Sequence, residues 1–148
     1  MTLKSTKKNA KIHICNIQSA GEDRDRIELS TEGTFYRRGE SFYLLYQEPD
    51  PETGLWGDSI LLKVVDGTVV MKRIGGVSSE MRFKPGKTEN CCYRMPYGSL
   101  EITLDCRRAA VELNDQGGWI QLDYILKIGS GIYQNDLTIQ VEAGKDDV

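Results

Sequence analysis

Two charged side chains share a face with apolar residues in predicted β-strands, which makes them the first candidates for binding chemistry. In residues 42–48, the two-residue alternation places Glu48 on the same side as Tyr46. Arg73 similarly shares a side with Met71. If both sides face the interior of a barrel, each charge needs a partner, because stranding a charge in an apolar interior is costly. The sequence therefore predicts an ion pair between Glu48 and Arg73.

Four tyrosines could bring hydroxyl groups to the same interior. They are Tyr46, Tyr93, Tyr97 and Tyr124. Together with the ion pair they could orient a ligand, but barrel aromatics also serve as packing residues, and an ion pair can simply brace the strands. Both interpretations stay open. Glu32, beside a glycine, is either a second interior acid or a solvated side chain.

Motif matches for catalysis and metal binding are incomplete. Residues 57–60, Gly-Asp-Ser-Ile, resemble the nucleophile block of one esterase class, but the only histidine, His13, lies upstream of it. Residues 86–88, Gly-Lys-Thr, end like a phosphate-binding loop, but Met81 replaces the leading glycine and no helix is predicted to follow. The four cysteines lack the paired spacing of a zinc site. We therefore expect no metal and no cofactor, and structural cysteines.

Length, charge and hydropathy describe one ordinary domain. The chain has 148 residues with 19 basic and 22 acidic side chains and a net charge of -3, so nucleic acid is not an expected partner. No apolar run approaches the roughly 20 residues that span a bilayer, so no membrane partner is expected. Polar residues 1–10 predict a flexible tail rather than a secretion signal. We expect a cytoplasmic protein with a single domain at 11–148.

A long hairpin near the C-terminus organises the rest of the predicted structure. Apolar residues occupy alternate positions from Ile120 to Ile128, and after a Gly-Ser-Gly reversal the alternation resumes from Leu137 to Val141. A two-stranded ribbon of this length cannot bury its own apolar face. Further strands must therefore close over it.

Turn signals recur at short intervals along the remaining sequence. Asp66-Gly67 predicts a hairpin with a type I′ turn, and Pro96 predicts a corner because proline interrupts ladder hydrogen bonding. Gly33 predicts a bend or bulge within a strand. Residues 49–57, rich in proline and acids, predict an exposed loop.

The spacing of these signals predicts an all-β fold. Apolar parity changes after Cys106, which predicts a bulge at 107–110, with a short helix at 109–113 as the alternative. Nine or ten short strands with no long helical pattern indicate one antiparallel sheet. So many twisted strands tend to curl and close, which removes exposed edges. The expected architecture is a single closed antiparallel barrel.

An ordered set of residues extends over most of the chain. The set comprises Thr31-Glu32-Gly33, Tyr46, Glu48, Leu62-Lys63-Val64, Arg73, Gly75, Ser79, Met81, Phe83, Tyr93, Pro96-Tyr97-Gly98, Gly117-Gly118, Tyr124 and Asn135. In this order it resembles the YwiB-like family of small bacterial proteins of unknown function. Met95 departs from the threonine expected before the Pro-Tyr-Gly corner. The resemblance implies a closed barrel of eight to ten strands similar to the lipocalin or calycin group, and it implies no established activity.

Three functions are consistent with this interpretation. The leading hypothesis is a non-enzymatic barrel that binds a small amphipathic ligand, with Glu48, Arg73 and the four tyrosines at its polar end. The second is an enzyme in which Glu48 or Glu32 acts as a general acid or base. The third is a filled barrel whose outer face, with Trp119 and Ile125, forms a homodimer or docks a protein.

Overall fold

The computed structural model describes residues 7–49 and 56–144, which form ten β-strands and no helix. The strands are β1 (Lys7–Ala20), β2 (Asp23–Arg38), β3 (Ser41–Pro49), β4 (Trp56–Val65), β5 (Thr68–Ile74), β6 (Ser79–Phe83), β7 (Thr88–Met95), β8 (Gly98–Asn114), β9 (Gly117–Ile128) and β10 (Gly131–Ala143). Among the described residues, no helix is long and apolar enough to cross a membrane.

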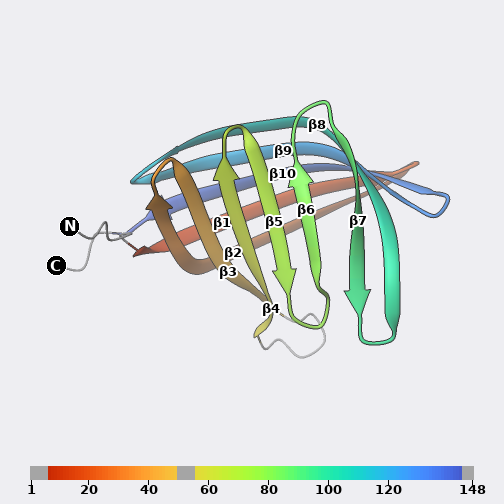
Figure 1. Ribbon diagram of the computed structural model, residues 1–148, viewed down its shortest axis with the longest axis horizontal. Helices are drawn as coiled ribbons and strands as arrows, with labels where there is room; N and C mark the ends of the chain where they lie inside the picture. The colour runs from red at the N-terminus through yellow and green to blue at the C-terminus, as the bar shows by residue number, and fades with distance from the viewer. Residues whose placement is uncertain (1–6, 50–55, 145–148) are drawn as a thin grey trace.

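The strands form one antiparallel sheet that curls until its two edge strands meet. The strand order is β6-β5-β4-β3-β2-β1-β10-β9-β8-β7. Beside these edges, Ser78 and Arg94 exchange two backbone hydrogen bonds of 2.9 Å. Figure 1 shows β3 to β6 crossing in front of the long strands β8, β9, β10 and β1. The predicted all-β antiparallel barrel is confirmed as nearly closed, with a seam between β6 and β7.

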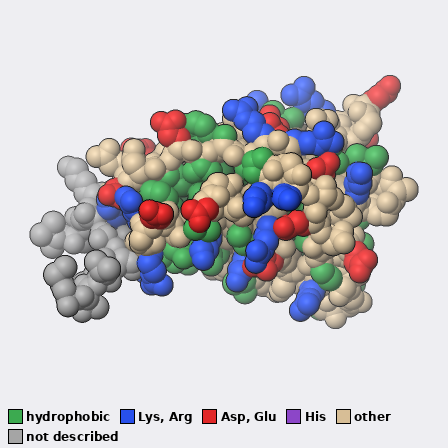
Figure 2. Space-filling model, turned by 45° about the horizontal axis from the view of Figure 1, so that its top comes forward, with side chains coloured by type: hydrophobic (Ala, Val, Ile, Leu, Met, Phe, Trp, Pro, Cys, Tyr) green, Lys and Arg blue, Asp and Glu red, His purple; other side chains and the backbone are tan. Residues whose placement is uncertain are grey.

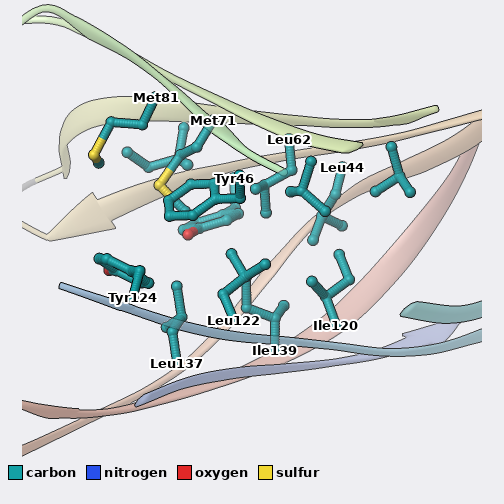
Figure 3. Packing of buried hydrophobic residues seen from close by; sticks show 14 of the residues in the cluster. Leu44, Tyr46, Leu62, Met71, Met81, Ile120, Leu122, Tyr124, Leu137 and Ile139 are labelled. Atoms are coloured by element: carbon teal, nitrogen blue, oxygen red, sulfur yellow. The ribbon is translucent and has the colours of Figure 1, made fainter. Parts of the chain in front are cut away.

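Side chains from opposite walls meet in the barrel interior. Leu62 from β4 and Leu122 from β9 are fully buried, and Figure 3 shows the front strands contributing residues that face those of β9 and β10. The predicted apolar face is buried at alternate positions from Ile120 to Leu126, as the period of two requires. Ile128, at the end of β9, is only partly buried.

One end of the interior, which we call the apolar end, is filled by aromatic and aliphatic side chains. It lies where β4 and β8 end and β3 begins. Phe35 and Phe42 stack there with ring centroids 5.8 Å apart. The narrow gap between the lining side chains has no room for a water molecule. The opposite end, where β3, β5 and β7 end, carries the polar residues and is called the polar end.

Local turn chemistry agrees with the sequence at most positions. Asp66 and Gly67 have φ angles of 49° and 71°, as a type I′ turn requires. The register of β8 against β9 shifts between Cys106 and Arg108, which confirms the predicted bulge. The alternative of a helix at 109–113 is wrong, because these residues pair with β9 throughout.

Two predictions along the first strands are corrected. Lys7 to Ala10 belong to β1 rather than to a flexible tail: Ala10 pairs with both β2 and β10, and its side chain is 3% exposed because it packs in the hydrophobic core. Residues 1–6 lie outside the described residues, as do residues 50–55 of the predicted loop. At Gly33 the ladder continues without a bulge. A Cβ at this position would overlap the Leu45 carbonyl, so glycine permits a close approach of β2 to β3.

Candidate ligand-binding site

Arg73 links two carboxylates at the polar end of the barrel. Its Nη1 donates to Glu48 Oε2 at 2.8 Å and its Nη2 donates to Glu48 Oε1 at 3.2 Å, so the two side chains form a bidentate pair. Nη1 also donates to Asp58 Oδ2 at 3.3 Å. The predicted pair of Glu48 and Arg73 is therefore present, and Asp58 is a third member. We call these three residues the ionic cluster.

Strand register and a tight turn hold the ionic cluster together. Arg73 lies directly opposite Ile60 in the ladder of β4 and β5, and Asp58 precedes Ile60 by two positions on the same face. The backbone N–H of Gly76 donates to Asp58 Oδ1 at 2.8 Å. Gly75 has a φ of 153°, and a Cβ there would overlap the Asp58 carboxylate. Glycine at this turn therefore lets the chain pass close to the cluster.

The ionic cluster is partly open to solvent. The exposed fractions of the side chains are 23% for Arg73, 33% for Glu48 and 19% for Asp58. Burial on its own lowers the pKa of Arg73, but the hydrogen bonds and the negative charge of Glu48 outweigh it, so the pKa is raised. The guanidinium therefore stays charged, and it faces two acidic partners.

Three of the four candidate tyrosines lie close enough to Arg73 to respond to its charge. Tyr46 and Tyr124 are buried, and Tyr93 is half-buried. Burial raises the pKa of all three hydroxyls, and the positive charge of Arg73 acts in the opposite direction on each. The polar end thus combines one cation, two carboxylates and neutral tyrosine hydroxyls.

The structure does not bring Tyr97 to this group. Tyr97 and Pro96 form the two-residue turn between β7 and β8, and Tyr97 is 87% exposed. A side chain at the tip of such a turn lies beyond the last pair of the ladder, so it is not held over the interior. The Pro96 corner is therefore a hairpin turn, and its tyrosine is outside the site.

A hollow of about 450 Å³ lies along the seam and reaches Arg73. Ser79 and Glu80 of β6 line it on one side, and Cys91 and Cys92 of β7 line it on the other. Among the described residues, β6 and β7 share no ladder beyond the bridge that precedes β6. The Ser79 Oγ is buried there without a hydrogen-bond partner in the described part of the chain. The seam therefore offers both space and an unused polar group.

A second polar group lies inside the barrel. Asn135 is 2% exposed, and its Oδ1 accepts hydrogen bonds from Asn16 Nδ2 and Gln18 Nε2, both at 3.2 Å. Its Nδ2 donates to the Tyr133 carbonyl at 3.2 Å. These bonds tie β1 to β10, and Asn135 lies opposite Tyr124 in the ladder of β9 and β10. The Asn135 amide therefore braces the strands beside the buried Tyr124.

The other candidates lie on the outer face of the sheet. Glu32 is exposed and lines an outer hollow of about 520 Å³ together with His13, so the solvated interpretation of Glu32 is confirmed. His13 Nδ1 lies 2.9 Å from Ser30 Oγ. Trp119 and Ile125 are partly buried on β9. No group of three or more metal-ligating side chains occurs among the described residues.

Comparison with known proteins identifies the family. Residues 12–139 match the family described as Domain of unknown function (DUF1934). The chain belongs to the DUF1934 family. It is 27% identical over 134 residues to the uncharacterized beta-barrel protein YwiB of Bacillus subtilis (strain 168), covering 90% of this chain and 92% of that protein. The crystal structure of ywiB protein from Bacillus subtilis matches with a TM-score of 0.85 at 25% identity, over 94% of both chains. The resemblance drawn from the ordered residues is therefore confirmed.

In this DUF1934 barrel, sequence reasoning missed two members of the polar end. Asp58 shares the parity of the apolar residues Ile60 and Leu62, but it directly follows the loop predicted at 49–57 and was not assigned to a strand. β4 in fact begins at Trp56. Ser79 shares the parity of the buried residues of β6, and its position beside the seam followed from closure of the sheet rather than from any local signal.

Proposed function

We propose that this barrel binds a small amphipathic molecule whose head group is uncharged and forms hydrogen bonds. The observation that carries the proposal is the hollow at the seam, which reaches the ionic cluster from outside the barrel. In this arrangement the head group contacts Ser79 and Arg73, and the Tyr93 hydroxyl lies close enough to Arg73 for the two to interact electrostatically. A half-open cavity with a few converging polar groups is the usual form of a small-molecule site.

The balance of charge supports an uncharged head group. Three cationic and three anionic side chains surround the hollow and the cluster behind it, so their formal charges cancel. They are Lys72, Arg73 and Arg94 against Glu48, Asp58 and Glu80. Lys72 and Glu80 also pair with each other, with 3.7 Å between Nζ and Oε1. An anionic ligand that binds Arg73 would have to displace Glu48 from it, and a cationic ligand would meet three positive groups.

The packing of the interior supports a ligand whose apolar portion is short and stays at the seam. The apolar end is filled by its own side chains, so it has no space for a long hydrocarbon tail. Ile74, which lines the hollow, is 58% exposed, and Cys91 on the opposite side is partly buried. A small ring or short chain against these two residues would remove apolar surface from water.

A fluorescent probe tests the proposal directly. N-phenyl-1-naphthylamine is uncharged and combines an N–H donor with apolar rings. We expect saturable one-to-one binding in a fluorescence titration. Because one hydrogen bond contributes about 0.5–1.5 kcal/mol, we expect affinity to fall about 2- to 12-fold in Ser79→Ala and in Tyr93→Phe. Tyr97→Phe is the matched control and should bind as the wild type does.

Two results would contradict the proposal. A folded wild-type protein that does not bind the probe would remove its basis, and so would unchanged affinity in both Ser79→Ala and Tyr93→Phe. The ionic cluster would then be a brace between strands. Mass spectrometry of small molecules that copurify with the chain provides a second test: an uncharged amphipath supports the assignment, and a phosphate or carboxylate ligand contradicts it.

The catalytic alternative receives less support from the geometry. Both carboxylate oxygens of Glu48 accept hydrogen bonds from Arg73, and neither Glu48 nor Asp58 lines the hollow, so the ionic cluster presents no carboxylate to a molecule bound there. Glu32 lies on the outer face of β2, away from the cluster. A role in binding, unlike one in general acid–base catalysis, requires no carboxylate that can reach the bound molecule.

A further inference from the structure

The first part of β2 has a free edge. β1 pairs with β2 from Asp23 onward, whereas β3 pairs with it only from Gly33 to Arg38. Among the described residues, no strand pairs with residues 23–32 on the side away from β1. Figure 1 shows this hairpin of β1 and β2 extending past the crossing strands of the front wall. An unpaired edge of this kind can accept another strand.

The hydrogen-bonding pattern of β2 determines which residues direct their backbone N–H and C=O groups toward the free edge. A two-residue turn at 39–40 joins Arg38 to Ser41, which makes them a hydrogen-bonded pair. Alternate residues of β2, counted from Arg38, therefore direct their backbone N–H and C=O groups toward β3 and, before Gly33, toward the free edge. These residues are Arg24, Arg26, Glu28, Ser30 and Glu32.

Side chains at the centre of this edge are exposed and of opposite charge. Ile27 is 61% exposed, and the Arg26 and Glu28 side chains are 65% and 44% exposed. Arg26 and Glu28 lie on the same face of β2, where they form an ion pair. An exposed isoleucine between two opposite charges makes this edge complementary to itself when it is reversed.

We propose that two copies of this chain form a homodimer by antiparallel pairing of these edges about a two-fold axis at Ile27. The pairing places Ile27 opposite Ile27 of the second copy. On each side of the axis, Arg26 lies opposite Glu28 of the second copy, so four charges alternate in sign. Opposite charges directly across an antiparallel pair are stabilising, and a symmetric interface repeats each contact twice.

Charge also selects one register. Moving the axis by one residue places Arg26 opposite Arg26, or Glu28 opposite Glu28, and like charges directly opposite each other are destabilising. With the axis at Ile27, Arg24 lies opposite Ser30 and Asp25 lies opposite Leu29, so the register brings no like charges together within residues 23–31. This self-complementarity identifies a second copy as the occupant rather than an unrelated peptide. Because a single strand pair is a small and exposed interface, the dimer should be weak and sensitive to salt.

Charge reversal in the full-length protein tests the register. Sedimentation velocity over a range of protein concentrations at low ionic strength should show a reversible dimer. Arg26→Glu and Glu28→Arg each replace two attractive pairs with two repulsive pairs, so each should raise the dimer dissociation constant by about tenfold or more. Combining both substitutions restores the alternation and should return the constant to within about threefold of wild type. Lys72→Glu, beside Glu80 on another exposed ladder, is the matched control and should leave dimerisation unchanged.

The outcomes that overturn the proposal are distinct. A wild-type chain that stays monomeric at all accessible concentrations excludes the dimer. A dissociation constant that Arg26→Glu and Glu28→Arg leave unchanged excludes this edge, as does a combined variant that stays as weak as the single variants. A dimer lost in Ile125→Asp but kept in Arg26→Glu would place the interface on the outer face of β9. Circular dichroism shows whether each variant retains its strands.

Discussion

The apolar end and the polar end of this barrel are held together in different ways. At the apolar end, Phe35 and Phe42 stack among aliphatic side chains and leave no room for water. At the polar end, Arg73 is held by directional bonds to Glu48 and Asp58, and all three remain partly exposed. Close packing cannot be rearranged without loss, whereas partly solvated polar groups can exchange partners. We expect stability to be concentrated at the first end and binding at the second.

Removing a ring from the apolar end should have the largest effect. Phe35 is 2% exposed and stacked on Phe42. Phe35→Ala should lower the free energy of unfolding by about 3–5 kcal/mol, because the surrounding strands can only partly close the cavity. Urea unfolding monitored by circular dichroism measures the loss. Exposed Tyr97→Ala is the control, and its effect should lie within about 0.5 kcal/mol. A loss below about 1 kcal/mol for Phe35→Ala would show that the apolar end is not tightly packed.

Removing the cation from the polar end should have a smaller effect. Arg73→Met keeps most of the side-chain volume but leaves Glu48 and Asp58 without a partner. Because both carboxylates reach solvent, the expected loss is about 1–3 kcal/mol rather than the larger loss of a fully buried pair. Adding Glu48→Gln should recover part of it, which the same urea experiment detects. A loss as large as that of Phe35→Ala would remove the proposed difference between the two ends.

Alkaline pH should weaken the barrel through its buried tyrosines. Burial raises the pKa of Tyr46 and Tyr124 above the ordinary value of 10.0, so the folded state retains protons that the unfolded chain releases. Their contribution to stability is complete below pH about 10 and falls as the pH rises, by up to about 1.4 kcal/mol per pH unit for each group. Tyr46→Phe and Tyr124→Phe should flatten this decline. Unfolding free energies between pH about 9 and 11 test it, and slopes that both variants leave unchanged would contradict it.

A pair of acids on the outer face should give the smallest effect. Asp123 lies directly opposite Asp136, and burial, followed by the hydrogen bond and charge of Asp136, raises the pKa of Asp123 above 3.8. The folded state therefore binds the Asp123 proton more tightly than the unfolded chain does. As the pH rises from 3.8 through the raised pKa, the free energy of unfolding falls. Asp123→Asn should stabilise the protein at pH 7 by a few tenths of a kcal/mol, because solvent screens the pair.

The difference in stability between Asp123→Asn and the wild type should depend on pH, and this dependence tests the prediction. Below the ordinary pKa of 3.8 the Asp123 carboxyl is protonated in both the folded and the unfolded chain, so the advantage of Asp123→Asn should disappear there. Thermal unfolding of both proteins at neutral and acid pH measures it. A variant that is less stable than wild type at pH 7 would show that the Asp123 carboxylate makes a favourable contact on this face.

Sequence patterns predicted much of the ladder because they depend on neighbouring residues. The Asp66-Gly67 pair specified its turn through backbone conformation, and the alternation of side chains specified which face of β9 is buried. The change of parity after Cys106 located the bulge. Parity also placed Glu48 and Arg73 on interior faces, and the need to partner an interior charge then predicted their contact.

Predictions that depended on distant partners were incomplete. Residues 7–10 looked like a polar tail, but pairing with β2 and β10 makes them part of β1. Residues 109–113 could form a helix locally, but pairing with β9 overrides that preference. Tyr97 shared its residue type with the interior tyrosines, but its turn leaves it in solvent. No local pattern contained the pairing with distant strands, although the corner predicted at Pro96 did mark the neighbourhood of Tyr97 as a turn.

The sequence alone assigns faces, turns and the approach of Glu48 to Arg73, because a period of two and a few turn residues are read over short distances. The tertiary structure determines the rest: the seam beside Ser79, the second carboxylate of the ionic cluster, Asp58, and the free edge of β2. These features depend on where the ends of the ten strands lie relative to one another. The twist and packing that accumulate along the whole sheet set those relative positions.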